Sequence, residues 1–318
     1  GILFSSTSRG RGEVYKRQQE DGTAEVFGQA FAATAMSGVV LSLPTQRVNT
    51  ELQIRDGFLI TAAFWIVLSL YGSLPFLLSD AIEVSVFGAI FESVSGLTTT
   101  GATVLAGLDT LPESILFYRQ LLQWLGGIGI IVLAVAVLPM LGIGGVQLYR
   151  AESTGPAKDS KLTPRITSTA KALFSIYLGL TIACAAAYYL AGMSAFDAIS
   201  HAFSTIAIGG FSTHDASMGY FQSDVILLIA CLFMLISAVN FGLHFVAFSK
   251  RNPGIYRFDS ETKFFSGVLL ISAIVTCITL VAMGTLSADK AIIHGLLQTV
   301  SLSLIHISEP TRRRGNSN

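Results

Sequence analysis

Apolar and polar positions alternate along this chain in long blocks. Each long apolar block holds close to the ~20 residues that an α-helix needs to cross the hydrocarbon core of a bilayer, and a polar segment follows each block. We predict membrane-spanning helices at six places, of which the first is the least apolar and stops at Pro44: residues 24–43, 57–78, 114–141, 173–191, 225–248 and 264–283.

Three other apolar stretches, residues 84–97, 195–208 and 291–301, are too short to span a bilayer. The first is amphipathic and enters Ser95-Gly-Leu-Thr-Thr-Thr-Gly-Ala-Thr103, and the second enters Gly209-Gly-Phe-Ser-Thr213. A short helix that runs into a Gly- and Thr-rich loop between two spans is typical of a re-entrant pore loop, because irregular backbone is tolerated at membrane depth where it lines a cavity. The alternative for each loop is a packing turn.

The pattern of span, short helix, loop and span repeats at the level of single residues. Five residues of the first copy recur 109 positions later: Phe87, Ala89, Ile90, Ser95 and Gly101 match Phe196, Ala198, Ile199, Ser204 and Gly210. A third copy aligns Ser95 with Ser301 and would place its loop glycine at position 307, where the chain has Ile307. Such repeats predict an all-α polytopic membrane protein built from membrane-helix, pore-loop, membrane-helix units, two complete and a third truncated, of a four-repeat ion pore.

The two ends of the chain do not fit this pattern. The nucleotide sequence CTG TCT CTT ATA CAC AT translates to Leu302-Ser-Leu-Ile-His306, and its last two bases begin the codon of Ile307. The reverse complement of the same sequence contains GTG TAT AAG AGA CAG, which translates to Val14-Tyr-Lys-Arg-Gln18. One inverted sequencing-adapter sequence thus explains both ends, so we expect residues 1–18 and 302–318 to be non-native and their basic residues to bind no nucleic acid. The expected divisions between them are an N-terminal helix and linker (19–55), a first repeat (56–146), a cytoplasmic loop (147–171), a second repeat (172–250) and a linker with a partial third repeat (251–301).

Composition agrees with a membrane protein, and the missing catalytic motifs argue against an embedded protease or metalloenzyme. Charged residues make up 13% of the chain, against about 25% in soluble domains, and the mean hydropathy is +0.63. Cys184, Cys231 and Cys277 lie in separate apolar runs without metal or redox spacing. The sequence contains no HExxH motif and no Ser/His/Asp constellation, so we expect no catalytic activity and no cofactor.

Charge placement orients the predicted helices. Basic residues collect in the segments that join the repeats, which the positive-inside rule assigns to the cytoplasm: Arg47, Arg55, Arg150, Lys158, Lys161, Arg165, Lys171, Lys250, Arg251, Arg257 and Lys263. Acidic residues collect around the short helices, where Lys290 and Arg119 are exceptions: Asp80, Glu83, Asp109, Glu113, Asp197, Asp215 and Asp224. Both loops are therefore expected on the outer side, where an acidic vestibule concentrates cations.

The loop chemistry suits a dehydrated monovalent cation. Backbone carbonyls can replace the water around such an ion, and glycine allows the backbone conformations that turn carbonyls inward. Each short helix points its C-terminal end, with its negative partial charge, toward the pore axis. Since a single loop cannot surround an ion, we expect four loops to form one filter.

Several other residues in or next to the apolar stretches are candidates for a functional role, and most of them have two possible roles. Glu92 and His201 fall on the two short helices and either support the loops from behind or contact the ion. Asn240 and His244 either line an inner cavity or bond between helices, and Gly126, Gly127 and Gly129 form either a hinge or a close helix contact. His214 and Asp215 follow the second loop and are candidates for solvated loop residues.

Four segments closely resemble TrkH-type bacterial potassium uptake proteins of the Trk/Ktr superfamily. They are Ser95–Thr103, Phe117-Tyr-Arg-Gln120 with Gln123-Trp-Leu-Gly-Gly127, Leu148-Tyr-Arg-Ala-Glu152, and Thr205-Ile-Ala-Ile-Gly-Gly-Phe-Ser-Thr-His-Asp215. The resemblance covers residues 57–301. It implies four repeats around one pore, a homodimer in the inner membrane and a cytosolic TrkA-type nucleotide-binding regulatory partner.

Carried over by motif, the resemblance assigns the K⁺ filter. The first quarter is Thr99, Thr100 and Gly101, and the second is Ile208, Gly209 and Gly210. Thr98, Glu92 and Phe211 are the expected supporting residues, and K⁺ is the only metal expected to bind. The family also has a gating loop in its third repeat, beyond residue 301.

The expected function is K⁺ uptake, either channel-like or proton-coupled. One alternative is a Na⁺-coupled or weakly selective cation transporter, although a glycine at position 101 favours K⁺ where a serine would favour Na⁺. Another is a non-transporting membrane scaffold that docks the cytosolic partner through the basic residues of 150–171.

Overall fold

The computed structural model describes residues 23–43, 54–129, 166–252, 254–283, 293 and 295–301. All regular secondary structure in these ranges is helical. The expected adapter-derived ends, most of the cytoplasmic loop and the third filter position lie outside the described residues.

The first unit follows an N-terminal helix, α2 (Thr23–Ser42). It consists of α3 (Ile54–Gly72), the short α4 (Leu74–Leu78), α5 (Val86–Leu97), the 3₁₀ turn η2 (Leu108–Thr110) and α6 (Glu113–Gly127). The helix α5 is the predicted short helix of residues 84–97. Residues 130–141 of the predicted span that begins at 114 lie outside the described residues.

The second unit repeats this order. It consists of α10 (Ile166–Leu190), the short α11 (Ala195–Ala207), the 3₁₀ turn η5 (Ser217–Phe221), α12 (Asp224–Ala238) and α13 (Phe241–Lys250). After α14 (Ile255–Phe258), the long α15 (Ser260–Ala282) corresponds to the predicted span of residues 264–283. Residues 295–301, from the predicted third short helix, are helical as well.

One predicted span is wrong as a single helix. The run 225–248 divides into α12 and α13, whose axes differ by 87°. At this break Val239 is extended and Asn240 Oδ1 accepts from Gly242 N at 2.8 Å, so the amide side chain starts a new helix instead of continuing the old one. In the run 57–78, α3 and α4 meet at Ser73, which has helical backbone angles, and Pro75 lies two residues further on. Ser73 N donates to Ser69 O and Leu77 N to Ser73 O, both at 3.1 Å, so the apolar helix continues through this residue to Leu78.

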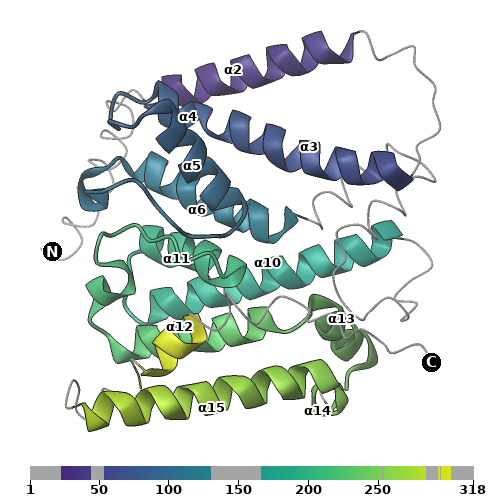
Figure 1. Cartoon of the computed structure of the whole chain (residues 1–318), viewed down its shortest axis with the longest axis vertical. Coiled ribbons are helices and arrows are strands. Elements are labelled where there is room, and N and C mark those ends of the chain that lie inside the picture. The colour runs from purple at the N-terminus through teal and green to yellow at the C-terminus, as the bar shows by residue number, and fades with distance from the viewer. Residues whose placement is uncertain are drawn as a thin grey trace, which may run out of the picture.

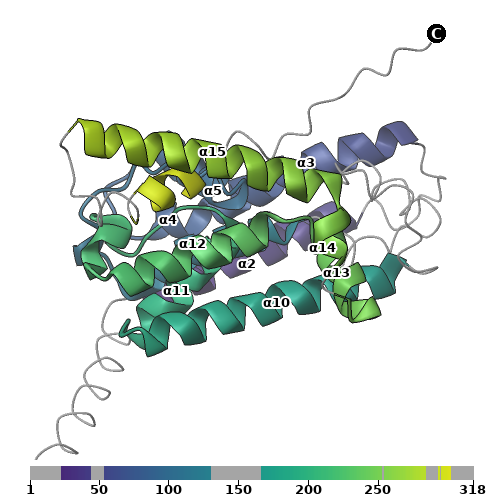
Figure 2. The ribbon, with the colours of Figure 1, turned by 90° about the horizontal axis from the view of Figure 1, so that it is seen from below.

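The two units pack side by side around their short helices. In Figure 1, α10 lies along the middle of the molecule, with the first-unit helices above it and α12 and α15 below it. Helix α11 packs against both α10 and α6, and α5 packs against α6 and α3. The short helices and α6 therefore meet at the boundary between the units. Seen from below in Figure 2, α12 lies between α15 and α10.

Among the described residues, three helical segments are long and apolar enough to cross a membrane: Thr23–Ser42, Lys171–Leu190 and Thr262–Ala282; a fourth results if α12 and α13 together form one broken span. Large apolar side chains on α2 and α15, such as Val39, Val40, Ile271 and Ile278, are more than half exposed. Such side chains on spanning helices suit a hydrocarbon environment rather than water.

Candidate functional site

The short helices α5 and α11 begin in the same way. Ser85 Oγ accepts from Gly88 N at 3.1 Å, and Ser194 Oγ accepts from Asp197 N at 3.0 Å. Both serines are N-caps, which satisfy an N–H group that the first helical turn leaves unpaired. Each partner pair is 109 positions from its counterpart, so the repeat in sequence is also a repeat in hydrogen bonding.

The loops that follow these helices, residues 98–103 (loop 1) and 207–212 (loop 2), also begin alike. Thr100 N donates to Ser95 O at 2.9 Å and Thr99 N to Gly96 O at 3.0 Å. In the second copy Gly209 N donates to Ser204 O at 2.9 Å and Ile208 N to Thr205 O at 3.2 Å. This pair of bonds is the Schellman motif, which ends a helix with one left-handed residue.

That left-handed residue is unusual in both copies. Thr99 and Ile208 each have φ +55°, although β-branched residues rarely adopt positive φ. Gly101 (φ +76°) and Gly210 (φ +83°) follow two positions later, and the residues between have negative φ. This alternation rotates successive peptide planes, so that neighbouring carbonyls can face the same side of the loop. The strain of the β-branched residues identifies both loops as functional candidates.

The two loops meet at their glycines. A Cβ on Gly101 would fall on the carbonyl oxygen of Gly209, and a Cβ on Gly209 would fall on the side chain of Gln123 in α6. Gln123 Oε1 in turn accepts from Phe211 N at 3.1 Å. The predicted filter residues of both units therefore lie against one another, with α6 behind loop 2.

Glu92 lies behind loop 1 and is fully buried. Its carboxylate accepts from Thr103 Oγ1 at 2.9 Å, Val104 N at 3.1 Å and Arg119 Nε at 2.7 Å. Because protein donors occupy both carboxylate oxygens, this geometry favours the supporting role over contact with an ion.

His201 takes the place of Glu92 in the second unit, 109 positions later. Its Nδ1 lies 2.9 Å from Asp197 O and its Nε2 lies 3.0 Å from Ser212 Oγ. Ser212 Oγ also accepts from His214 N, just as Thr103 Oγ1 accepts from Leu105 N, both at 3.1 Å. An imidazole and a carboxylate thus support equivalent hydroxyls in the two units.

The other expected supporting residues lie close to these groups. Thr98 Oγ1 is 2.7 Å from both Val94 O and Thr100 Oγ1, which ties the start of loop 1 to the end of α5. The Phe211 ring is buried and lies 4.4 Å from the guanidinium carbon of Arg119, at cation–π distance.

Gly126 and Gly127 bring α6 close to both short helices. A Cβ on Gly126 would fall on Leu97 O, and one on Gly127 would lie 2.9 Å from Ala207 Cβ. These two glycines therefore make close helix contacts. Gly129 lies against Trp65.

Asn240 and His244 bond within the protein. Asn240 caps α13, while His244 Nε2 lies 2.9 Å from Ile236 O and Nδ1 lies 2.9 Å from Tyr256 OH. His244 therefore bridges the break between α12 and α13 and links it to α14.

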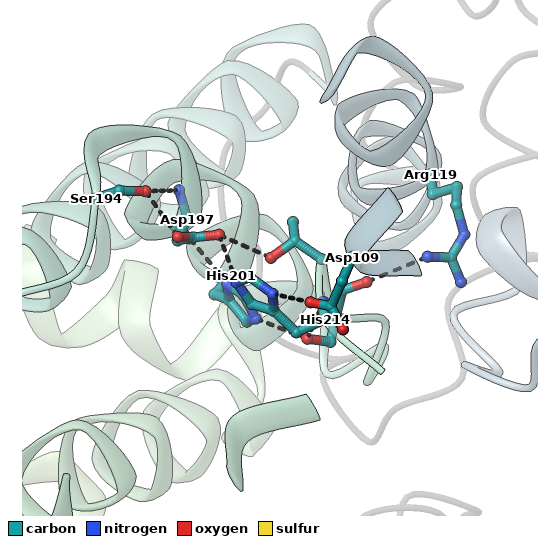
Figure 3. Close-up of polar contacts among 8 residues, drawn as sticks. Asp109, Arg119, Ser194, Asp197, His201 and His214 are labelled. Atoms are coloured by element: carbon teal, nitrogen blue, oxygen red, sulfur yellow. Dashed lines mark hydrogen bonds and ion pairs between the residues drawn. The ribbon is translucent and has the colours of Figure 1, made fainter. Parts of the chain in front are cut away.

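His214, expected in a solvated loop, lies instead in a cluster between the units (Figure 3). Its Nδ1 is 2.5 Å from Asp109 Oδ1, its Nε2 is 3.3 Å from Asp197 Oδ1, and its ring stacks on Tyr220 with centroids 3.5 Å apart. Since a carboxylate accepts only, Nδ1 carries the proton. This hydrogen bond is the main reason that the pKa of Asp109 lies below its ordinary value of 3.8.

We expect this contact to stabilise the protein above pH 3.8 and to weaken as pH falls through the lowered pKa of Asp109. His214 and Asp215 are the other titratable groups that act on Asp109. The melting temperatures of the purified protein and of Asp109→Asn should therefore differ at pH 6–7 and converge at lower pH. A difference that stays constant down to pH 3 would contradict this prediction.

Arg119 and Gln123 are site residues that the sequence analysis missed. Arg119 was named as an exception to the charge pattern and, like Gln123, as part of a motif, but neither was expected to contact the loops. One signal was available: a basic residue inside an apolar span is a functional candidate by default. Their partners in loop 2 are 93 and 88 residues away, beyond the reach of local patterns.

Known proteins resemble the sequence that builds this site. The family model TrkH, described as a cation transport protein, matches residues 23–313. The chain belongs to the TrkH family. This is a family of transporters rather than enzymes, and its members are multi-pass proteins of the inner membrane.

Relatives of this chain carry the name Trk system potassium uptake protein TrkH. The protein from Vibrio parahaemolyticus is 56% identical over 286 residues, which cover 89% of this chain and 59% of the relative. The protein from Escherichia coli K12 is 53% identical over 279 residues, covering 88% and 58%. The chain therefore spans about three fifths of the length of these TrkH relatives.

The fold matches a solved TrkH structure. The crystal structure of the potassium transporter TrkH from Vibrio parahaemolyticus superposes with a TM-score of 0.78 at 51% identity, covering 95% of this chain and 61% of that one. The all-helical membrane fold predicted from the apolar blocks is thus confirmed.

Proposed function

We propose that the complete protein containing this chain takes up K⁺ across the inner membrane, with loops 1 and 2 as two quarters of its selectivity filter. Thr99, Thr100 and Gly101 supply the first quarter, and Ile208, Gly209 and Gly210 supply the second. The observation that carries the proposal is the contact between Gly101 and the Gly209 carbonyl, made by two loops with the same backbone pattern.

Relatives and chemistry support K⁺ as the ion. The relatives described above are named as potassium uptake proteins. A ring of carbonyls selects a monovalent cation by replacing its hydration shell, and both loops have glycine where the carbonyls must turn. We place the filter on the periplasmic side, because basic residues lie in the segments that join the units. Coupling to protons is compatible with this arrangement.

We also propose that the complete protein forms a homodimer and binds a cytosolic TrkA-type subunit. The support is the Trk system to which its relatives belong by name. Nucleotide would bind to that subunit alone. Co-purification of a tagged TrkA-type protein with the complete protein tests this assembly, and recovery of the membrane protein without it would contradict it.

Rescue of growth tests the transport function. Because the chain spans only part of its relatives, residues 23–301 are placed in the Vibrio parahaemolyticus TrkH in place of the matching part. We expect this chimera to restore growth of a K⁺-uptake-deficient strain at low K⁺, with Rb⁺ uptake favoured over Na⁺. Normal membrane expression without rescue would contradict transport and leave the scaffold alternative, whereas rescue with equal Na⁺ uptake would support the weakly selective alternative.

A further inference from the structure

Arg119 is the one described residue whose side chain bonds to both loops through charged donors. Its Nε donates to Glu92 Oε1 at 2.7 Å and its Nη2 to Thr103 Oγ1 at 3.0 Å, both in the first unit. Its Nη1 donates to the Ser212 carbonyl at 3.1 Å, at the end of loop 2. Figure 3 shows this side chain extending from α6 toward the cluster around His214.

We propose that Arg119 is a positioning residue that holds loops 1 and 2 at a fixed separation and thereby sets ion selectivity. This inference rests on the proposed function, because it assigns a role to a residue behind the same filter. Arg119 itself does not contact the ion.

The geometry of the guanidinium suits this role. It presents five N–H donors in a rigid plane, so three acceptors bound to one group are held at fixed angles to one another. The Phe211 ring faces the same plane at 4.4 Å from the guanidinium carbon, which limits movement of the guanidinium toward loop 2. A lysine at this position would keep the charge but would lack the rigid fork.

Because the Arg119–Glu92 pair is buried, the loss of either partner is expected to cost stability. The side chains of Arg119 and Glu92 are 1% and 0% exposed, so neither charge can turn to solvent if its partner is lost. Removing one member of such a pair strands a buried charge, whereas removing both does not. A double neutral variant can therefore separate the stability of the pair from its effect on the loops.

The sharpest test changes a partner of Arg119 by a single group. In the chimera described above, Thr103→Val keeps the side-chain volume but removes the hydroxyl that accepts from Arg119 Nη2 and Leu105 N and donates to Glu92, whereas Thr103→Ser keeps the hydroxyl. We expect Thr103→Val to reduce the preference for Rb⁺ over Na⁺ uptake roughly tenfold, the size expected when a hydrogen bond to a charged group is lost. Thr103→Ser should retain most of the preference.

Two further variants separate positioning from folding. Glu92→Gln/Arg119→Gln should recover the melting temperature that Arg119→Gln alone loses, yet its ion preference should stay low. Arg119→Lys should fold and also show reduced preference. As a control for general loosening of α6, Leu116→Ala empties a buried site in the core of the first unit and should lower the melting temperature without changing the preference.

The outcomes are distinct. Wild-type preference in Thr103→Val and in the double neutral variant would overturn the positioning role while leaving the proposed function intact. If the unmodified chimera shows no uptake, the proposed function fails first. Thermal stabilisation of the purified protein by K⁺ relative to Na⁺ then tests the positioning role alone, since an ion that binds the folded state raises its melting temperature. A K⁺ advantage that Thr103→Val leaves unchanged would overturn it by this measure too.

Discussion

Replacing Gly101 with alanine is expected to abolish K⁺-dependent growth rescue and to reduce uptake by roughly two orders of magnitude, the cost of a displacement of about 1 Å at a site that needs defined geometry. Two effects act together. The residue has φ +76°, which costs a non-glycine residue about 1–2 kcal/mol. The new Cβ would also fall on the Gly209 carbonyl oxygen and push loop 2 away.

Gly192→Ala is the matched control for this prediction. Gly192 also has positive φ, +105°, but a Cβ there has no atom within 4 Å and the residue lies in the turn after α10. We expect this variant to lose some stability and to keep most of its uptake. Uptake of the wild-type chimera and both variants, normalised to membrane expression, decides the matter, and unchanged uptake in Gly101→Ala would refute the filter assignment. Gly101→Asp should be inactive as well, because it adds a charge to the same clash.

Replacing Gly126 with alanine is expected to destabilise the fold by about 1–3 kcal/mol, the usual cost of overpacking. The α6 backbone lies directly against Leu97 O at the end of α5, so an added methyl group must separate the two helices. Because loop 1 begins one residue after Leu97, the filter should move with it. We expect the melting temperature to fall by roughly 4–8 °C, measured on protein purified in detergent.

The control for Gly126 lies in another helix. Gly179 is in α10, where a Cβ meets no atom within 4 Å. Gly179→Ala should therefore be neutral or slightly stabilising, since alanine is the better helix former. Equal melting temperatures for the Gly126 and Gly179 variants would show that α6 and α5 can separate without cost.

The fold could be predicted from sequence where the signal was local. The lengths of the apolar stretches predicted most helices, including both short helices that carry Glu92 and His201, and the 109-residue repeat showed that the two short helices are equivalent. The break at Asn240 was missed because the run 225–248 is otherwise apolar, and one capping side chain outweighs that pattern. Nothing local indicated that Thr99 and Ile208 adopt positive φ, because their β-branched side chains disfavour it and only the surrounding structure can impose it.

The site, like the fold, could be predicted only where the sequence signal was local or repeated. Residues on the short helices and loops follow from the repeat, which places equivalent positions at equivalent depths. The repeat does not point to Arg119, because the equivalent position 109 residues later is Leu228, which carries no charge. Its partners are separated from it by 16 to 93 residues, and only the packing of α6 between the units brings them together.

The difference between Glu92 and His201 has a consequence for how such a pore can change over time. In an assembly of identical subunits, a substitution beside the filter appears in every quarter at once. Here the two copies lie on one chain, so one position can hold a carboxylate while its equivalent holds an imidazole, and a single arginine can serve both loops. Equivalent positions of an internal repeat can thus diverge separately while the backbone of the two loops stays the same.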